Sequence, residues 1–402
     1  CVFKSACTLR DMKIFPSSEY REIIQYTGYW IVVSILIGVI SGVSSSLIFA
    51  CFDLANKVRG VYPWLIYFLP FIGLMLGYLF YYYGTPIEKG THLLIDEIHQ
   101  PKAFIPKRMS PLIFVSAILT QIFGGSAGRE APAVQLSGAL TDHLTQVFKV
   151  PHDNRKIFLI ASIGSGFAAI FGLPLAGAIY GLEITSLGKL RYSAVFPCFV
   201  SAVIASQVPE FFHIVHPHQY YVVASFPKLT SEVIISLIVA GVVFGIIARI
   251  FIASIHFVSQ RLNRHITFMP FRPMVGGILI MLMTLMVGQQ TFNGLGVHSM
   301  IASFYHELPV TDFIGKLIFT ATTLGSGFKG GEITPLFFVG TTLGNALGQF
   351  LPLPISLLAG LGLVSLFAGA SKAPLTSIIL AIELFGVAIA EYAVITCLLA
   401  YL

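Results

Sequence analysis

The stretch that decides the fold is residues 124–135, which read GGSAGREAPAVQ. It places an arginine and a glutamate side by side, between glycines and a proline, in a chain with only 10% charged residues. Glycines allow the backbone to leave helical geometry, and Pro132 favours the first turn of a helix, where its missing N–H costs nothing. The stretch therefore predicts a helix that begins at about Ala131, directly after the charged pair.

The rest of the chain is apolar enough to lie within a lipid bilayer. Of its 402 residues, 56% are hydrophobic and the mean hydropathy is +0.85, whereas soluble domains carry about 25% charged residues. Uncharged runs such as 29–52, 62–85 and 157–182 reach the roughly 20 apolar residues of a membrane-spanning helix. No segment alternates like the roughly 10-residue strands of a membrane barrel. We therefore predict a multi-pass, all-α integral membrane protein, with the bilayer as a partner and no nucleic acid.

The predicted helical segments are uneven in length. They are 28–53, 62–84, 110–123, 131–148, 155–171, 174–187, 192–207, 230–262, 270–290, 311–325, 333–350, 354–370, 374–388 and 390–402. A polar loop with a short helix is expected at 85–108. Several segments are too short to cross a membrane, and broken helices are tolerated there where the freed backbone is buried in protein or lines a cavity.

The two halves of the chain resemble each other. FAAIFGLPLAGAIYGLE at 167–183 matches FAGASKAPLTSIILAIE at 367–383 in six of 17 positions, at an offset of 200. Gly125-Ser126 matches Gly325-Ser326 at the same offset. Such ordered matches indicate a duplication, and paired, interrupted segments in the two halves of a transporter point to its substrate site.

Four regions follow from this pattern. Residues 1–27 are expected to form a cytoplasmic amino-terminal segment, because Lys4, Arg10, Lys13 and Arg21 precede the first span. Residues 28–207 form the first membrane repeat, 208–229 a linker loop and 230–402 the second repeat. The apolar run that reaches Leu402 leads us to expect one further element after it.

The broken segments have the chemistry of an anion site. A helix N-terminus carries a positive partial charge and unpaired N–H groups. In the second half, GSGFKGGEITP at 325–335 precedes an uncharged helix from Ile333, just as the first stretch precedes Ala131. Two such N-termini directed at one point in the membrane would hold a small anion without the full positive charge that would slow its release.

Glu130 is then a candidate for both gating and proton transfer. Its carboxylate can occupy the anion site and can leave when it is protonated, and ionisable residues inside a membrane are functional candidates by default. The alternative is that Glu130 pairs with Arg129 or caps a helix. Arg129 itself either pairs structurally, faces the headgroups or contacts the anion.

At this point the motifs resemble those of the CLC family of chloride channels and anion/proton antiporters. GREAPAVQ at 128–135 is similar to that family's GREGPxVQ, and GGEITP at 330–335 takes the place of its GGxFxP. The resemblance covers about residues 20–402. It implies two inverted-topology repeats of broken and tilted helices around a central anion path, and a homodimer with one pore per subunit. It also makes Glu130 the gating glutamate.

Three departures resemble the fluoride/proton antiporter branch, CLC-F. Where chloride members have GSGIP, this chain has GTHLLIDEIH at 90–99. Chloride/proton exchangers of the family often have a second, internal glutamate, and this chain has Ile184 at that position. It also has Glu332 and Thr334 where chloride members have an apolar residue and a phenylalanine. Ala131-Pro132 and Thr91-His92 are not that branch's usual residues. The resemblance implies export of fluoride in exchange for protons across a bacterial inner membrane. The alternatives are a chloride channel or chloride/proton antiporter of the same fold, or a permease for an uncharged solute.

The site residues follow from the donors that a strongly hydrated anion needs. Hydroxyl, imidazole, backbone N–H and protonated carboxyl groups can donate hydrogen bonds. We expect Glu130 and Glu332 to carry protons, and the anion to be bound by Thr91, His92, Gly128, Arg129, Ala131, Ile333, Thr334 and Phe337. Thr91 or Glu332 could instead cap a helix, His92 could line a vestibule without touching the ion, and Thr334 could bond to the backbone.

Other polar residues are predicted to be structural. Asp96, Glu97, His99, Lys102, Lys107 and Arg108 are expected to form a solvated loop, and Glu183 and Glu383 to hydrogen-bond at helix ends. The five cysteines are scattered and fit neither a metal site nor a disulfide framework. No nucleotide-binding loop is present. The sequence thus predicts a transporter rather than an enzyme, without metal or cofactor.

Overall fold

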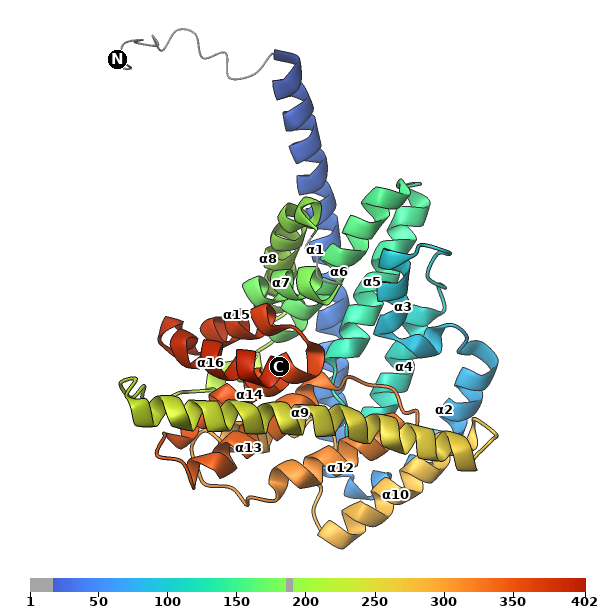
Figure 1. Ribbon diagram of the computed structural model, residues 1–402. Helices are drawn as coiled ribbons and strands as arrows, with labels where there is room; N and C mark the ends of the chain where they lie inside the picture. The colour runs from blue at the N-terminus through green and yellow to red at the C-terminus, as the bar shows by residue number, and fades with distance from the viewer. Residues whose placement is uncertain (1–16, 186–190) are drawn as a thin grey trace, which may run out of the picture.

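The computed structural model describes residues 17–185 and 191–402, and within these ranges its regular structure is helical. The first 16 residues of the expected amino-terminal segment 1–27 lie outside the described ranges. The helices are α1 (Ser17–Val61), α2 (Leu69–Tyr83), α3 (Thr91–His99), α4 (Met109–Ile122), α5 (Glu130–Val147), α6 (His152–Phe171), α7 (Pro174–Ile184), α8 (Val195–Phe211), α9 (Ser231–His265), α10 (Phe271–Val287), α11 (Val297–Ala302), α12 (Asp312–Gly325), α13 (Ile333–Gly348), α14 (Ile355–Ser371), α15 (Pro374–Phe385) and α16 (Ala390–Tyr401) (Figure 1).

Most predicted segments are present, with shifted ends. The helix predicted from Ala131 begins at Glu130, and the helix predicted from Ile333 begins there. The first segment is longer than 28–53, because no glycine–proline break interrupts it before Pro63. The end of the segment predicted at 174–187 lies outside the described ranges. Helix α11 was not predicted, since its six residues are too few to show a period.

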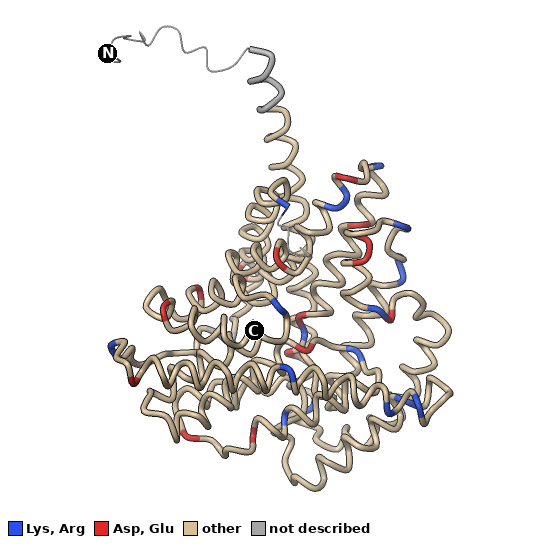
Figure 2. Tube along the Cα trace, viewed as in Figure 1, with Lys and Arg blue, Asp and Glu red and all other residues tan. Residues whose placement is uncertain are grey.

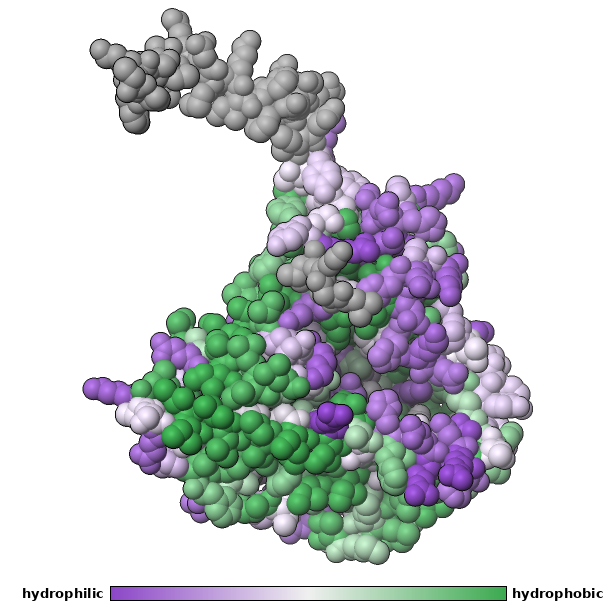
Figure 3. Space-filling model, viewed as in Figure 1, coloured by the Kyte–Doolittle hydropathy of each residue, from purple (hydrophilic) through white to green (hydrophobic). Residues whose placement is uncertain are grey.

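Within the described residues, four helical stretches are long and apolar enough to cross a membrane. They are Ile24–Val61, Pro63–Tyr83, Tyr192–Phe211 and Ser231–His265. The shorter helices pack against one another, α5 on α6 and α13 on α14. Figure 3 shows a broad hydrophobic surface over α9 and its neighbours beside a hydrophilic edge. A surface of this kind is suited to contact with lipid.

Two reciprocal caps join the halves of the chain. Glu183, at the end of α7, accepts hydrogen bonds from the backbone N–H groups of Leu375 (2.9 Å) and Thr376 (2.7 Å) at the start of α15. Glu383, at the end of α15, accepts from Leu175 (2.8 Å) and Ala176 (2.7 Å) at the start of α7. Carboxylates are stabilised at helix N-termini. The expected hydrogen bonding is present, and it sets α7 and α15 antiparallel, as an inverted repeat requires.

A buried ionic cluster fastens the 85–108 loop over the start of α6. Arg155 donates to Asp142 (2.6 Å), Glu97 (3.1 Å) and the Ala103 carbonyl (2.9 Å). The expectation that Glu97 is solvated is therefore wrong, because its side chain is needed to neutralise a guanidinium that is only 3% exposed.

Basic residues gather on one face of the molecule. The face that holds the 85–108 loop, the α5–α6 turn and the α9–α10 turn carries Lys102, Lys107, Arg108, Lys149, Lys156, Arg261, Arg264 and Arg272. Figure 2 shows charged residues gathered along that edge of the molecule. An excess of Lys and Arg marks the cytoplasmic side of a membrane protein. We call this the inner face.

Candidate ion-transport site

The N-termini of α5 and α13 meet inside the protein. Two residues before α5, Gly128 exchanges two backbone hydrogen bonds of 2.7 Å with Gly331, two residues before α13. This antiparallel bridge holds the two helix starts side by side. Helix α5 runs from this point toward the inner face, and α13 runs from it the other way, so two positive helix ends face a common region.

Gly331 is required by this close approach. A Cβ atom at this position would collide with the Glu130 carboxylate and lie 3.0 Å from the Ala131 nitrogen. The glycine thus leaves room for a negatively charged group between the two helices.

Glu130 fills that room. Its side chain is fully buried. One carboxylate oxygen accepts from the Ile333 N–H (2.6 Å) and the other accepts from the Thr334 hydroxyl (2.7 Å). The carboxylate of the first half is therefore bound by the helix N-terminus of the second half. The alternative reading of Thr334, that its hydroxyl bonds to the backbone, is wrong here, because the carboxylate is the stronger acceptor.

An inner cavity of about 290 Å³ opens from Glu130 and Ala131. It is lined by residues of α3, α5, α7 and the segment before α13. Besides Glu130, its polar lining residues are Glu88, Lys89, Thr91, His92, Gln135, Tyr180, Lys329 and Glu332. Six predicted site residues thus share one cavity: Thr91, His92, Glu130, Ala131, Glu332 and Ile333.

Neither Thr91 nor Glu332 acts as a helix cap. The Thr91 hydroxyl accepts from the Gln135 side-chain amide (3.1 Å) in the first turn of α3. Glu332 precedes α13, makes no side-chain capping bond and is exposed. His92 is also exposed in the cavity. Glu332 is therefore open to water in this cavity, whereas the Glu130 carboxylate is buried at its inner end.

A small outer cavity of about 40 Å³ lies beyond Thr334. Arg129 and Phe337 line it, with Tyr221 and His216. Arg129 is 7% exposed, and its guanidinium carbon lies 3.7 Å from the centre of the Phe49 ring. Within the described residues it forms no ion pair, so the expected structural pairing with a carboxylate is not observed. Glu130 and Thr334 stand between the two cavities.

The sequence pattern did not predict five polar residues of the inner cavity: Glu88, Lys89, Gln135, Tyr180 and Lys329. Tyr180 lies in the repeated segment, and Lys329 lies inside the quoted motif GFKGGE. The motif position could have marked Lys329. Nothing local marks Tyr180, because its approach to the cavity depends on how α7 packs against α15.

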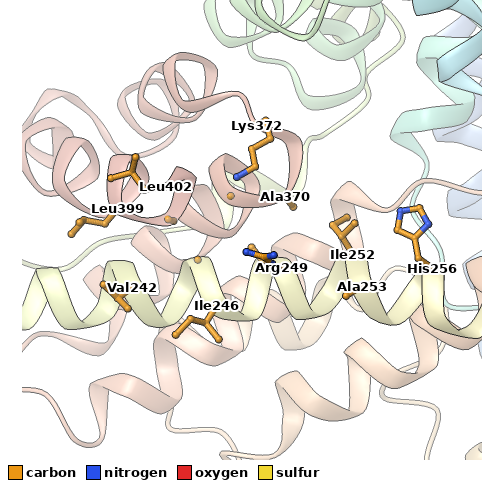
Figure 4. Close-up of a pocket in the computed structure, with 14 residues that line it drawn as sticks. Val242, Ile246, Arg249, Ile252, Ala253, His256, Ala370, Lys372, Leu399 and Leu402 are labelled. Carbon is orange, nitrogen blue, oxygen red and sulfur yellow. The ribbon is translucent and has the colours of Figure 1, made fainter. Parts of the chain in front are cut away.

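A third cavity lies away from this path. It has a volume of about 590 Å³ and lies among α9, α14 and α16. Arg249 and Lys372 point toward one another across it (Figure 4). Its lining residues include none from the inner or outer cavity, so we place it off the ion path.

Comparison with known proteins decides the family. Residues 72–402 match the family model described as voltage gated chloride channel. The chain belongs to this family. The resemblance to CLC proteins inferred from the motifs is therefore confirmed, as is the all-α membrane fold.

Individual relatives agree with this assignment. A chloride/fluoride channel protein of Pseudomonas syringae is 40% identical over 98% of this chain and 88% of its own length. The H+/Cl− exchange transporter ClcA of Vibrio campbellii is 30% identical over 69% of this chain and 62% of its own. Among solved structures, a CLC-type fluoride/proton antiporter superposes with a TM-score of 0.89 at 30% identity, covering 93% of this chain and 95% of that one. As a member of this family, the protein is an integral membrane transport protein of the CLC type, not an enzyme.

Proposed function

We propose that this protein exchanges fluoride for protons across a bacterial inner membrane and exports fluoride. The observation that carries the proposal is the position of Glu130, whose carboxylate is bound at the N-terminus of α13. Two similar proteins support this choice of ion, because their names include fluoride. They are the chloride/fluoride channel protein of Pseudomonas syringae and the CLC-type fluoride/proton antiporter of known structure.

The exchange begins with competition for one set of donors. Fluoride enters through the inner cavity past Thr91 and His92, drawn by the two helix N-termini. It can bind the Ile333 N–H and the Thr334 hydroxyl only when the Glu130 carboxylate leaves them. Gly128, Ala131 and the backbone around them complete the proposed site.

Glu130 is released from these donors when it takes up a proton from the outside. A neutral Glu130 carboxyl loses its charge-assisted hydrogen bonds to Ile333 and Thr334. The anion then moves past Thr334 into the outer cavity beside Phe337 and Arg129. The proton on Glu130 passes to the inner cavity, where Glu332 is the proposed next carrier. One anion moving out is thereby coupled to protons moving in.

Chloride transport in the same fold is the second candidate. It is favoured by the relative named as an H+/Cl− exchanger. The Thr334 hydroxyl favours fluoride, because a small, strongly hydrated anion needs an added donor to replace its water. A permease for an uncharged organic solute fits poorly with an outer cavity of about 40 Å³.

The organisation expected from the sequence is part of the proposal. Residues 28–207 and 230–402 form the two membrane repeats, with 208–229 as linker and 1–27 on the cytoplasmic side. We also propose a homodimer in which each subunit has its own path.

Liposome efflux tests the ion and the coupling together. Purified protein is reconstituted in liposomes loaded with either fluoride or chloride, and a pH-sensitive dye records proton entry. Fluoride efflux accompanied by proton entry is expected, with much slower chloride efflux. Chloride leaving as fast as fluoride would replace the fluoride assignment by the chloride one. Fluoride efflux without proton movement would replace antiport by a channel.

A further inference from the structure

A second polar cavity adjoins the inner cavity, and we call it the side cavity. It has a volume of about 380 Å³ and lies between α2, the end of α9, the start of α10 and the end of α12. Its apolar lining residues include Leu76, Phe80, Met269 and Pro273, and its polar ones are Glu88, Lys89, Ser259, Asn263, Arg272, Ser326 and Lys329. Glu88, Lys89, Leu324 and Lys329 line both cavities.

The side cavity has an excess of positive charge. Lys89 is already paired with Asp96 at 2.8 Å. Arg272 donates to the carbonyls of Ile266 (3.0 Å) and Thr267 (3.5 Å) and has no carboxylate partner among the described residues. Its guanidinium therefore keeps donors for a ligand.

Lys329 adds a second unpaired cation. Its ammonium lies 4.5 Å from the centre of the Phe80 ring, and Phe80 lines the side cavity but not the inner cavity. Within residues 17–185 and 191–402 it has no hydrogen-bond acceptor. Arg272 and Lys329 thus face a cavity whose own carboxylate is Glu88, which attracts Lys329 but forms no salt bridge with either cation within the described residues, so positive charge is in excess.

Aromatic side chains place the side cavity at the depth of the lipid headgroups. The centre of the Phe268 ring lies 5.8 Å from that of Tyr78, 5.5 Å from that of Tyr81 and 5.3 Å from that of Phe271. All four side chains are exposed. Exposed tyrosine and other aromatic rings gather where hydrocarbon meets water. The same α9–α10 turn supplies Arg272, and Figure 2 shows basic residues at this end of α9.

We infer that the side cavity binds the phosphate headgroup of an anionic phospholipid from the cytoplasmic leaflet. Arg272 and Lys329 contact the phosphate, Ser259 and Asn263 donate further hydrogen bonds, and the apolar floor covers the adjoining glycerol. Basic pockets between membrane helices on the cytoplasmic side suit such headgroups, and arginine suits phosphate geometry. Free phosphate would leave the apolar floor and the aromatic cluster unused. This inference is independent of the transported ion.

Lipid retention tests the inference on the intact protein. The purified protein is exchanged into mixed phosphatidylglycerol and phosphatidylcholine, and native mass spectrometry counts the lipids retained per subunit. Asn263→Asp places a negative charge on the rim at an exposed position of α9 whose side chain makes no hydrogen bond within the described residues, so folding should be unaffected. Gln260→Glu makes the same charge change at an exposed position outside the lining.

Selective retention of phosphatidylglycerol is expected for the natural protein and for Gln260→Glu, with at least a tenfold weaker affinity in Asn263→Asp. Arg272→Gln should also lose the lipid. Equal retention by Asn263→Asp and Gln260→Glu would overturn the site. A second arm adds inorganic phosphate at millimolar concentration, and displacement of the lipid by it would show that the site takes free phosphate instead. Arg272 also donates hydrogen bonds to backbone carbonyls, so Arg272→Gln could lower the stability of the protein. If that variant fails to fold, Asn263→Asp alone decides the result.

Discussion

Glu130 is fully buried, and each of its carboxylate oxygens accepts one hydrogen bond from the second half of the chain. A buried carboxylate is costly unless it is hydrogen-bonded. The donors that offset this cost, a helix N-terminus and a hydroxyl, are those that a dehydrated anion would use. Binding of the carboxylate and binding of the anion therefore exclude each other, and protonation selects between them.

Replacing the carboxylate removes the proton carrier. Glu130→Gln keeps the size of the side chain and cannot exchange a proton, so proton entry should fall to background while anion movement continues. Dye and ion-electrode recordings on the same liposomes measure both. Glu232→Gln, at an exposed position at the start of α9, is the matched control and should leave coupling intact. Unchanged proton entry in Glu130→Gln would remove this residue from the mechanism.

The Thr334 hydroxyl should matter more for fluoride than the shape of the side chain. Thr334→Val removes one donor to an anion, an interaction of about 1.5–3 kcal/mol, so fluoride efflux should slow by about tenfold or more. Thr334→Ser keeps the hydroxyl and should retain most of the rate. The comparison of initial efflux rates separates donation from packing, and equal rates in the two variants would contradict a role for the hydroxyl.

At the scale of elements, the bridge between the segments before α5 and α13 sets the spacing of the two N-termini. Gly331→Ala places a methyl group against the Glu130 carboxylate and the Ala131 nitrogen. Because the nearby backbone cannot move away cheaply, we expect transport to fall to background with the fold retained. Gly60→Ala, where an added methyl meets nothing within 4 Å, is the control. Near-normal efflux in Gly331→Ala would mean that the carboxylate need not occupy this position.

The buried ionic cluster of α5, α6 and the 85–108 loop should carry stability rather than transport. Arg155→Met leaves Asp142 and Glu97 buried without their partner, which costs about 3–5 kcal/mol. Lys156→Met breaks a pair with the exposed Asp153 and should cost less than about 1 kcal/mol. Thermal unfolding in detergent measures the difference, and similar midpoints for the two variants would argue against a buried cluster.

The helix starts could be predicted because their signals are local. Glycines followed by a proline mark a helix start wherever they occur, so Glu130 and Ile333 were placed to within one residue. The contacts of Arg155 join three segments that only the tertiary packing brings together, so Glu97 was assigned to solvent. The same limit applies to Tyr180 and to the ring of Phe49 under Arg129.

For the whole molecule, the repeat in the sequence predicts the symmetry but not its contacts. The match of 167–183 with 367–383 pairs Glu183 with Glu383, and in the fold these residues cap each other's helices. That the chain is a membrane protein follows from the composition alone. The number and position of cavities do not, because they are what remains after all side chains have packed.

We expect the proposed homodimer to form through the outer surface of α7, α8, α15 and α16. These helices are neighbours, and they expose apolar side chains that include Leu175, Phe196, Val203, Leu375 and Leu398. Contiguous apolar faces of this kind serve both lipid contact and association between subunits, so substitution must distinguish the two.

A charge on this surface should separate the subunits without blocking either path. Leu375→Arg places a cation in the proposed interface, where it would be desolvated against a second copy of itself, while Ile238→Arg places one on exposed α9 as a control. Light scattering in detergent should give twice 43.8 kDa for the natural protein and for Ile238→Arg, and 43.8 kDa for Leu375→Arg. Because the cavities around Glu130 are built from one chain, the separated subunit should still exchange fluoride. A dimer that survives Leu375→Arg would direct the search for the interface to another face.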